Sequence, residues 1–180
     1  DEKGVNLMTE SLKHAALLVI DVQMGMFAKS TIVYRAEQLI RNITSLVRSA
    51  QQAGTPVIFI QHSGEKDLIR DTPGWQFHPD LLKLGPDATV HKRHGNAFEE
   101  TELDQILKAR GVEQVVVTGM VTHGCVKNTC LGGLAAGYRV ILVADAHSSY
   151  SQKADQLILD WNAKLQKQGI RLKTTTEIAF

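Results

Sequence analysis

Cysteine is scarce in this chain of 180 residues, which contains only Cys125 and Cys130. Two thiols cannot form the disulfide framework of a small secreted domain, so we expect reduced thiols and a cytoplasmic protein. Long apolar runs are missing as well, because the longest, residues 15–20, is far too short to cross a bilayer. The N-terminal residues also lack a charged-then-apolar pattern with a small-residue cleavage site. We therefore expect no membrane partner.

An excess of one charge is also absent. The chain has 20 Lys and Arg against 19 Asp and Glu, which gives a net charge of +1 and no strong field to attract nucleic acid. The longest basic cluster, residues 91–94, is too short for a nucleic-acid footprint. The composition is otherwise that of an ordinary globular protein, with 43% apolar residues. The expected partner is a small-molecule substrate rather than nucleic acid.

Short apolar runs alternate with segments of helical spacing along the chain. The continuous runs predict buried strands at residues 16–22, 56–60, 88–92, 114–119, 139–144 and 170–174. Apolar recurrence at helical spacing predicts helices near residues 36–50, 101–107, 125–137 and 154–165. Buried strands that alternate with helices are typical of a parallel sheet covered on both faces. The predicted fold class is α/β, with three α/β/α layers and a mostly parallel, six-stranded, Rossmann-like sheet.

One domain accounts for this pattern. The length is enough for one substantial core but short for two, and we place the domain at residues 14–180, with residues 1–13 as an N-terminal extension. The numbering begins at Asp1 and the first methionine is Met8, so residues 1–7 are expected to be either foreign to the protein or a trimmed leader. Residues 63–88 hold three of the four prolines and no periodic run, which predicts a long surface excursion.

Three reactive side chains lie at or just beyond the carboxyl ends of three predicted strands: Asp21, Lys92 and Cys125. Ligands of open parallel sheets bind beyond the carboxyl ends of the strands, so the three can converge although they are far apart in sequence. Taken singly, each also has a structural interpretation, as a turn or cap residue, a solvated lysine and a buried inert thiol. Their shared position at strand ends favours a common site.

The chemistry of this set suits a cysteine nucleophile. A free thiol has a pKa of about 8.5, and a helix N-terminus and a neighbouring ammonium both favour the thiolate. We therefore expect Cys125 to be a thiolate over much of the neutral range and Cys130 to pack in the core. Asp21 can take the thiol proton and pass it to a leaving amine, and the turn 120–124 can supply N–H donors to an oxyanion. The parts suit acyl transfer from an amide to cysteine, followed by hydrolysis.

Motifs for metals and cofactors are not found. The histidines show no HExxH or HxH spacing, and the two cysteines are not a CxxC pair. The segment 119–124 lacks the further glycines of a dinucleotide-binding loop and the lysine of a P-loop. We expect neither a cofactor nor a catalytic metal. Trp75 and Phe77, in the long excursion, are expected either to line a pocket or to anchor the loop.

Four segments together resemble the isochorismatase-like cysteine hydrolases: "LLVIDVQMGMF" (17–27), "VHKRHGNAFEETELDQIL" (90–107), "VVVTGMVTHGCVKNT" (115–129) and "AAGYRVILVADAHSS" (135–149). The segment "PGWQFHPDL" and the last helix resemble the amidohydrolase branch that includes streptothricin hydrolase. The resemblance implies a catalytic triad of Asp21, Lys92 and Cys125. It also implies a cis peptide at Met120–Val121 and an oxyanion hole made by the N–H groups of Val121 and Cys125.

The departures from the family pattern bear on the substrate. Nicotinamidase relatives carry an Asp-x-His metal set after the second strand, where this chain has Gln61, His62 and Ser63. A cysteine nucleophile favours C–N bond hydrolysis over the alternatives, which are vinyl ether hydrolysis of the isochorismatase type and a non-catalytic binding protein. The family also implies a homodimer or a larger homo-oligomer. The residues expected to bind substrate are Gln23, Phe27, Trp75, His94 and His123.

Overall fold

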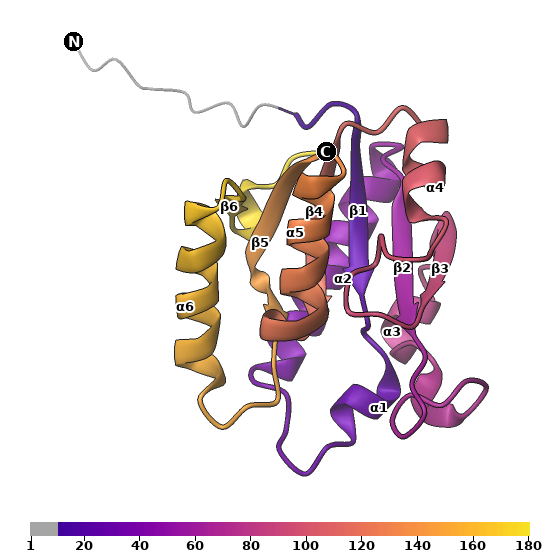
Figure 1. The fold of residues 1–180 in the computed structure, drawn as a ribbon, viewed down its shortest axis with the longest axis vertical. Helices are drawn as coiled ribbons and strands as arrows, with labels where there is room; N and C mark the ends of the chain where they lie inside the picture. Colours follow the sequence, from indigo (N-terminus) through magenta and orange to yellow (C-terminus); the bar gives the residue numbers. More distant parts are fainter. Residues whose placement is uncertain (1–10) are drawn as a thin grey trace.

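The computed structural model describes residues 11–180, which form an α/β/α sandwich around one six-stranded sheet (Figure 1). The strands lie in the order β3-β2-β1-β4-β5-β6, and every neighbouring pair is parallel. They are β1 (Ala15–Ile20), β2 (Val57–His62), β3 (Ala88–Lys92), β4 (Gln114–Met120), β5 (Arg139–Ser148) and β6 (Arg171–Lys173). The predicted fold class is confirmed. Most of the predicted N-terminal extension, residues 1–10, lies outside the described residues.

Helices cover both faces of the sheet. One face carries α2 (Ala36–Gln52) and the short α3 (Pro79–Leu82), and the other carries α4 (Leu103–Ala109), α5 (Lys127–Ala135) and α6 (Ala154–Lys167). The remaining short helix, α1 (Met24–Phe27), lies beyond the carboxyl end of the sheet, at the bottom of Figure 1. Between residues 11 and 180, no helix is long and apolar enough to cross a membrane.

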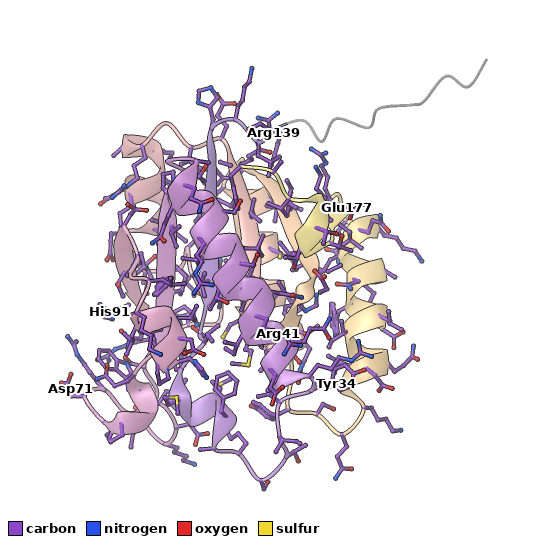
Figure 2. All side chains as sticks on the ribbon, turned by 180° about the vertical axis from the view of Figure 1, so that it is seen from behind. Tyr34, Arg41, Asp71, His91, Arg139 and Glu177 are labelled. Atoms are coloured by element: carbon purple, nitrogen blue, oxygen red, sulfur yellow. The ribbon has the colours of Figure 1, made fainter. Side chains whose placement is uncertain are left out.

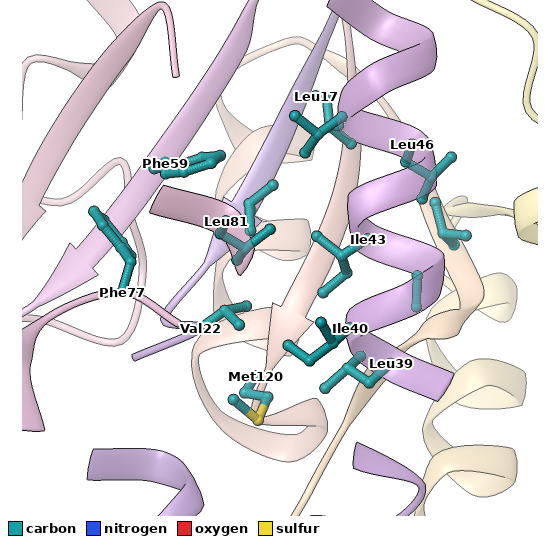
Figure 3. Packing of buried hydrophobic residues seen from close by; sticks show 14 of the residues in the cluster. Leu17, Val22, Leu39, Ile40, Ile43, Leu46, Phe59, Phe77, Leu81 and Met120 are labelled. Carbon is teal, nitrogen blue, oxygen red and sulfur yellow. The ribbon is translucent and has the colours of Figure 1, made fainter. Parts of the chain in front are cut away.

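Alternation along the strands divides the core into two halves. In β1, Leu17 and Val19 belong to the half beneath α2, whereas Leu18 and Ile20 belong to the half beneath α4 and α5. This is the two-residue period of a strand that is buried on both faces. On α2 the buried residues, among them Leu39 and Leu46, recur at helical spacing, and Figure 3 shows Ile40 and Ile43 on the side of the helix that faces the strands. Figure 2 shows the opposite, outer side of this helix, where Arg41 lies.

The excursion after β2 is more ordered than the sequence indicates. It contains a 3₁₀ turn at Pro73–Trp75 in addition to α3, and Phe77 pairs with Gln23 in an isolated bridge. Trp75 and Phe77 are both buried, and Phe77 packs edge-on against Phe59 of β2. The excursion is therefore held against the carboxyl ends of the strands, beside the predicted site.

Candidate active site

The carboxyl ends of four strands bring together the residues of the site. Asp21 follows β1 directly and has a left-handed backbone (φ 52°), which Asp tolerates better than most residues do. Lys92 is the last residue of β3. Cys125 lies in a π-helical turn, Thr122–Val126, that joins β4 to α5. The turn of the chain at Asp21 and the turn after β4 aim a carboxylate and a thiol at the same point.

Close packing of β1 against β4 supports this arrangement. Gly119, near the end of β4, has φ +118°, and a Cβ atom there would collide with the backbone of Ile20. Only glycine allows both the positive φ and the close approach. The residue before Asp21 and the strand before Cys125 are therefore held in direct backbone contact.

The Lys92 ammonium lies at the centre of the site. Its Nζ atom is 3.0 Å from Asp21 Oδ2, 3.0 Å from His62 Nδ1, 3.1 Å from the carbonyl oxygen of His94 and 3.2 Å from Cys125 Sγ. The structure thus brings Asp21, Lys92 and Cys125 together as the sequence predicts. It adds His62 and the His94 main chain to the set.

The ion pair between Lys92 and Asp21 is buried, with side-chain exposures of 0% and 3%. Charges are costly to bury, and removing one member of a buried pair typically costs about 3–5 kcal/mol because the other charge is left uncompensated. A pair of this kind is weak support for stability, and such costly buried charges are frequent at functional sites.

The protonation state of Cys125 differs from the sequence-based expectation. Burial is the largest influence and, together with the nearby Asp21 carboxylate, raises the pKa of the Cys125 thiol to about 12, against the opposing effect of Lys92. At neutral pH Cys125 is therefore a thiol and not the thiolate expected from the sequence. That expectation counted the ammonium and the helix N-terminus but not the desolvation of the sulfur. A thiol in this state can act as a nucleophile only with a base beside it.

Asp21 is placed to be that base. Its Oδ2 atom accepts a hydrogen bond from Lys92, whereas its Oδ1 atom is buried and has no hydrogen-bond partner within residues 11–180. An unpaired buried carboxylate oxygen is costly in a folded protein. A carboxylate oxygen of Asp21 lies within 4.8 Å of Cys125 Sγ, so this carboxylate is near enough to receive the thiol proton.

Buried side chains of β5 and α6 hold the turn that carries Cys125 in place. The Met120–Val121 peptide bond is cis. Next to it, Thr122 Oγ1 lies 2.8 Å from His147 Nδ1, and His147 Nε2 lies 2.8 Å from Asn162 Oδ1 of α6. This chain of three buried side chains links the turn to β5 and α6. Burial lowers the pKa of His147 to about 4, so the ring is neutral at neutral pH.

His62 belongs to the centre, although the sequence did not predict it there. It is the last residue of β2 and pairs with Lys92 in the β2–β3 register. Candidate ligand atoms of Asp21, His62 and Cys125 lie within 4.8 Å of one another, a spacing that could hold a metal ion. However, the Lys92 ammonium contacts all three, so a cation already occupies the space between them.

Two of the predicted substrate-binding residues brace the loop beside the site. Gln23 is fully buried, and its amide donates to the carbonyls of His62 and Trp75 and accepts from the His62 N–H. Trp75 is 8% exposed, stacks on His91 and donates from its ring nitrogen to Ser63. These contacts occupy the polar groups of both side chains, and contact with a substrate stays a prediction at both positions. Of the two alternatives for Trp75, the structure favours loop anchoring.

The other three predicted substrate-binding residues differ in position. Phe27 is half-buried and packs edge-on against His78. The His94 carbonyl accepts a hydrogen bond from Lys92, while its ring nitrogen Nε2 lies 3.0 Å from Glu100 Oε2. His123 is exposed on the nucleophile turn. His123 therefore stays a prediction as a substrate contact, whereas the His94 main chain belongs to the centre itself.

Fold and site together define a class of protein in which a parallel α/β/α sheet holds a buried Asp–Lys–Cys set at its carboxyl edge. The profile described as the isochorismatase domain matches residues 15–171, and the chain belongs to the isochorismatase family. The resemblance that the sequence motifs indicate is confirmed.

The chain is similar to several known proteins along most of its length. The chain is 33% identical over 147 residues to a streptothricin hydrolase of Streptomyces noursei, a match that covers 81% of this chain but only 58% of that protein. It is 26% identical to nicotinamidase 3 of Arabidopsis thaliana, with 82% and 79% covered. Among solved structures, an isochorismatase from Pseudomonas putida KT2440 superposes with a TM-score of 0.85 at 26% identity, covering 94% of this chain and 92% of that one.

Proposed function

We propose that the protein is a cysteine hydrolase that cleaves a C–N bond of a small amide, lactam or ureido compound through a thioester intermediate. The observation that carries this proposal is the contact of one buried ammonium with both a carboxylate and a thiol, Lys92 with Asp21 and Cys125. A binding protein has no need for this costly arrangement. The names of a streptothricin hydrolase and a nicotinamidase among its relatives also support hydrolysis.

In the proposed reaction, Asp21 accepts the proton of the Cys125 thiol, and the sulfur attacks the substrate carbonyl. Lys92 stabilises the negative charge on the sulfur while Asp21 is neutral. The N–H groups of Val121 and Cys125 are the proposed donors to the oxyanion; the Val121 N–H has no partner among the hydrogen bonds of residues 11–180. Asp21 then protonates the leaving amine, so the C–N bond breaks and a thioester remains.

Hydrolysis of the thioester completes the cycle. Asp21, again a carboxylate, accepts a proton from a water molecule that attacks the thioester carbonyl. The C–S bond breaks, the acid is released, and the proton on Asp21 returns to the sulfur. One water is consumed for each amide cleaved, and each residue returns to its starting protonation state.

The test is a panel of small amides, lactams and ureido compounds, including streptothricin and nicotinamide because relatives are named for them. We expect release of ammonia or amine from at least one member, an acyl adduct on Cys125 in quenched samples, and no turnover by Cys125→Ala. Cys130→Ala is the matched control and should turn over normally. A chelator should have no effect.

Three outcomes would contradict the proposal. Pyruvate released from isochorismate by both wild type and Cys125→Ala would favour ether hydrolysis driven by Asp21 and Lys92. Tight binding of a panel member with no turnover and no adduct would favour a non-catalytic binding protein. Restoration of chelator-inhibited activity by zinc would contradict the metal-free mechanism.

A further inference from the structure

We propose that His62 is a positioning residue that keeps the nucleophile protonated at rest: its Nδ1 atom holds one proton of the Lys92 ammonium, so that the sulfur of Cys125 has no donor until Asp21 takes the thiol proton. The inference rests on the proposed role of Cys125 as the nucleophile. It concerns a residue that the triad does not include and that acts only through Lys92.

A count of protons motivates the proposal. An ammonium has three N–H donors, but Lys92 Nζ has four neighbours within 3.2 Å: Asp21 Oδ2, His62 Nδ1, the His94 carbonyl and Cys125 Sγ. Oxygen and imidazole nitrogen are stronger acceptors than a thiol sulfur. They are also the three nearest neighbours, so the sulfur is the one left without a proton from Lys92.

The same geometry explains how the sulfur gains a donor when it needs one. When the S–H bond breaks and an O–H bond forms on Asp21, the carboxyl group becomes neutral and the sulfur becomes the stronger acceptor. The Lys92 proton that faced Asp21 can then turn to Cys125, because both acceptors already lie within 3.2 Å of Nζ. His62 and the His94 carbonyl keep their two protons throughout, so Nζ need not move.

His62 is held in the state and place that this role requires. Burial, followed by the Lys92 charge, lowers the pKa of His62, although Asp21 opposes the effect and His94 adds a little to it. The ring is therefore neutral near pH 7, with a lone pair on Nδ1 and the proton on Nε2. The main chain of His62 is fixed on both sides by the buried amide of Gln23, which binds its N–H at 2.9 Å and its carbonyl at 3.0 Å.

The two ring nitrogens can be tested separately by substitution. The side-chain oxygen of His62→Asn falls near the place of Nδ1 and can still accept from Lys92, whereas the amide of His62→Gln falls near Nε2 and cannot. His62→Leu lacks both groups. The measurement is the rate of iodoacetamide alkylation at Cys125 as a function of pH, with the labelled peptide identified by mass spectrometry. No substrate is needed, so the result does not depend on finding one.

We expect His62→Gln and His62→Leu to be labelled at Cys125 about tenfold faster than wild type at pH 7.5, because the freed proton of Lys92 turns to the sulfur and lowers the thiol pKa by about one unit. His62→Asn should stay within about twofold of wild type. A merely loosened site would be labelled faster in a Lys92→Met background as well. In that background, His62→Gln should have no effect on the labelling rate.

Three results would overturn the proposal: unchanged or slower labelling of His62→Gln, equal acceleration in His62→Asn and His62→Gln, or acceleration that persists in the Lys92→Met background. Thermal unfolding establishes that each variant is folded, and the Asn and Gln variants decide the matter if His62→Leu does not fold. Wild-type protein that hydrolyses nothing but shows this pattern would refute the proposed function and leave the role of His62 standing.

Discussion

Acid should destabilise this protein through His147, a residue that touches no part of the triad. The ring is buried between Thr122 and Asn162, and burial lowers its pKa from 6.5 to about 4. The His147 ring therefore takes up a proton near pH 6.5 in the unfolded chain but only near pH 4 in the folded protein. Because the unfolded chain binds this proton more readily, the free energy of unfolding decreases as the pH falls from 6.5 to 4, and the group has no effect at higher pH.

The size of the effect follows from the shift. A difference of roughly 2.5 pKa units corresponds to about 3 kcal/mol once the pH is below both values. Between pH 7 and pH 5 the loss should be about 2 kcal/mol, which is a large share of a typical total stability of about 5–15 kcal/mol. His62 and His78 shift in the same direction, so the contribution of His147 must be isolated by difference.

Urea unfolding of wild type and His147→Gln at several pH values isolates it. The variant should be less stable at pH 7, because the contacts with Thr122 and Asn162 change, but its stability should fall by about 2 kcal/mol less than that of wild type between pH 7 and pH 5. His123→Gln, at an exposed position in the same turn, should follow the wild-type curve. Parallel curves for wild type and His147→Gln would refute the reasoning, as would a wild-type His147 ring that titrates near pH 6.5 by NMR.

Three further predictions concern the core and the assembly. Cys130 is fully buried on α5, and its thiol pKa is raised to about 12 by burial, so Cys130→Ala should cost about 1 kcal/mol in urea unfolding and keep activity; preferential alkylation of Cys130 in native protein would contradict this. Gly119→Ala should cost about 3 kcal/mol or more, since the added Cβ meets the Ile20 backbone, and wild-type stability of that variant would exclude the close approach. Light scattering at micromolar concentration should give a dimer or larger, and a monomer mass would refute the expected homo-oligomer.

The parts of the fold that the sequence predicts are those set by local periodicity. The apolar runs and the helical spacing are properties of consecutive residues, and each predicted strand and long helix is present. The part of the site that lies at strand ends was also predictable. Asp21 comes directly after one apolar run, and Lys92 is the last residue of another. Their convergence required only a parallel sheet.

What the sequence could not show depends on register and on the direction of side chains. His62 becomes a partner of Lys92 only because β2 and β3 pair with these two residues opposite each other, and nothing in the spacing of 30 residues indicates that pairing. Gln23 and Trp75 lie near the site, and a polar or aromatic residue there can either contact a substrate or brace a loop. Only the direction of the Gln23 amide, toward the backbone of His62 and Trp75, separates the two roles.

The revised state of Cys125 changes how the whole centre should be understood. With a thiol, a carboxylate and an ammonium, the buried set has a net charge of zero, and it keeps that charge when the proton moves from Cys125 to Asp21. A resting thiolate beside the Asp21 carboxylate would leave two negative charges against one positive charge in a dry site, which desolvation opposes. In the proposed reaction, proton transfer and attack are therefore coupled by electrostatics. The proposal needs both Asp21 and Lys92, because Asp21 receives the proton and Lys92 compensates the negative charge before and after the transfer.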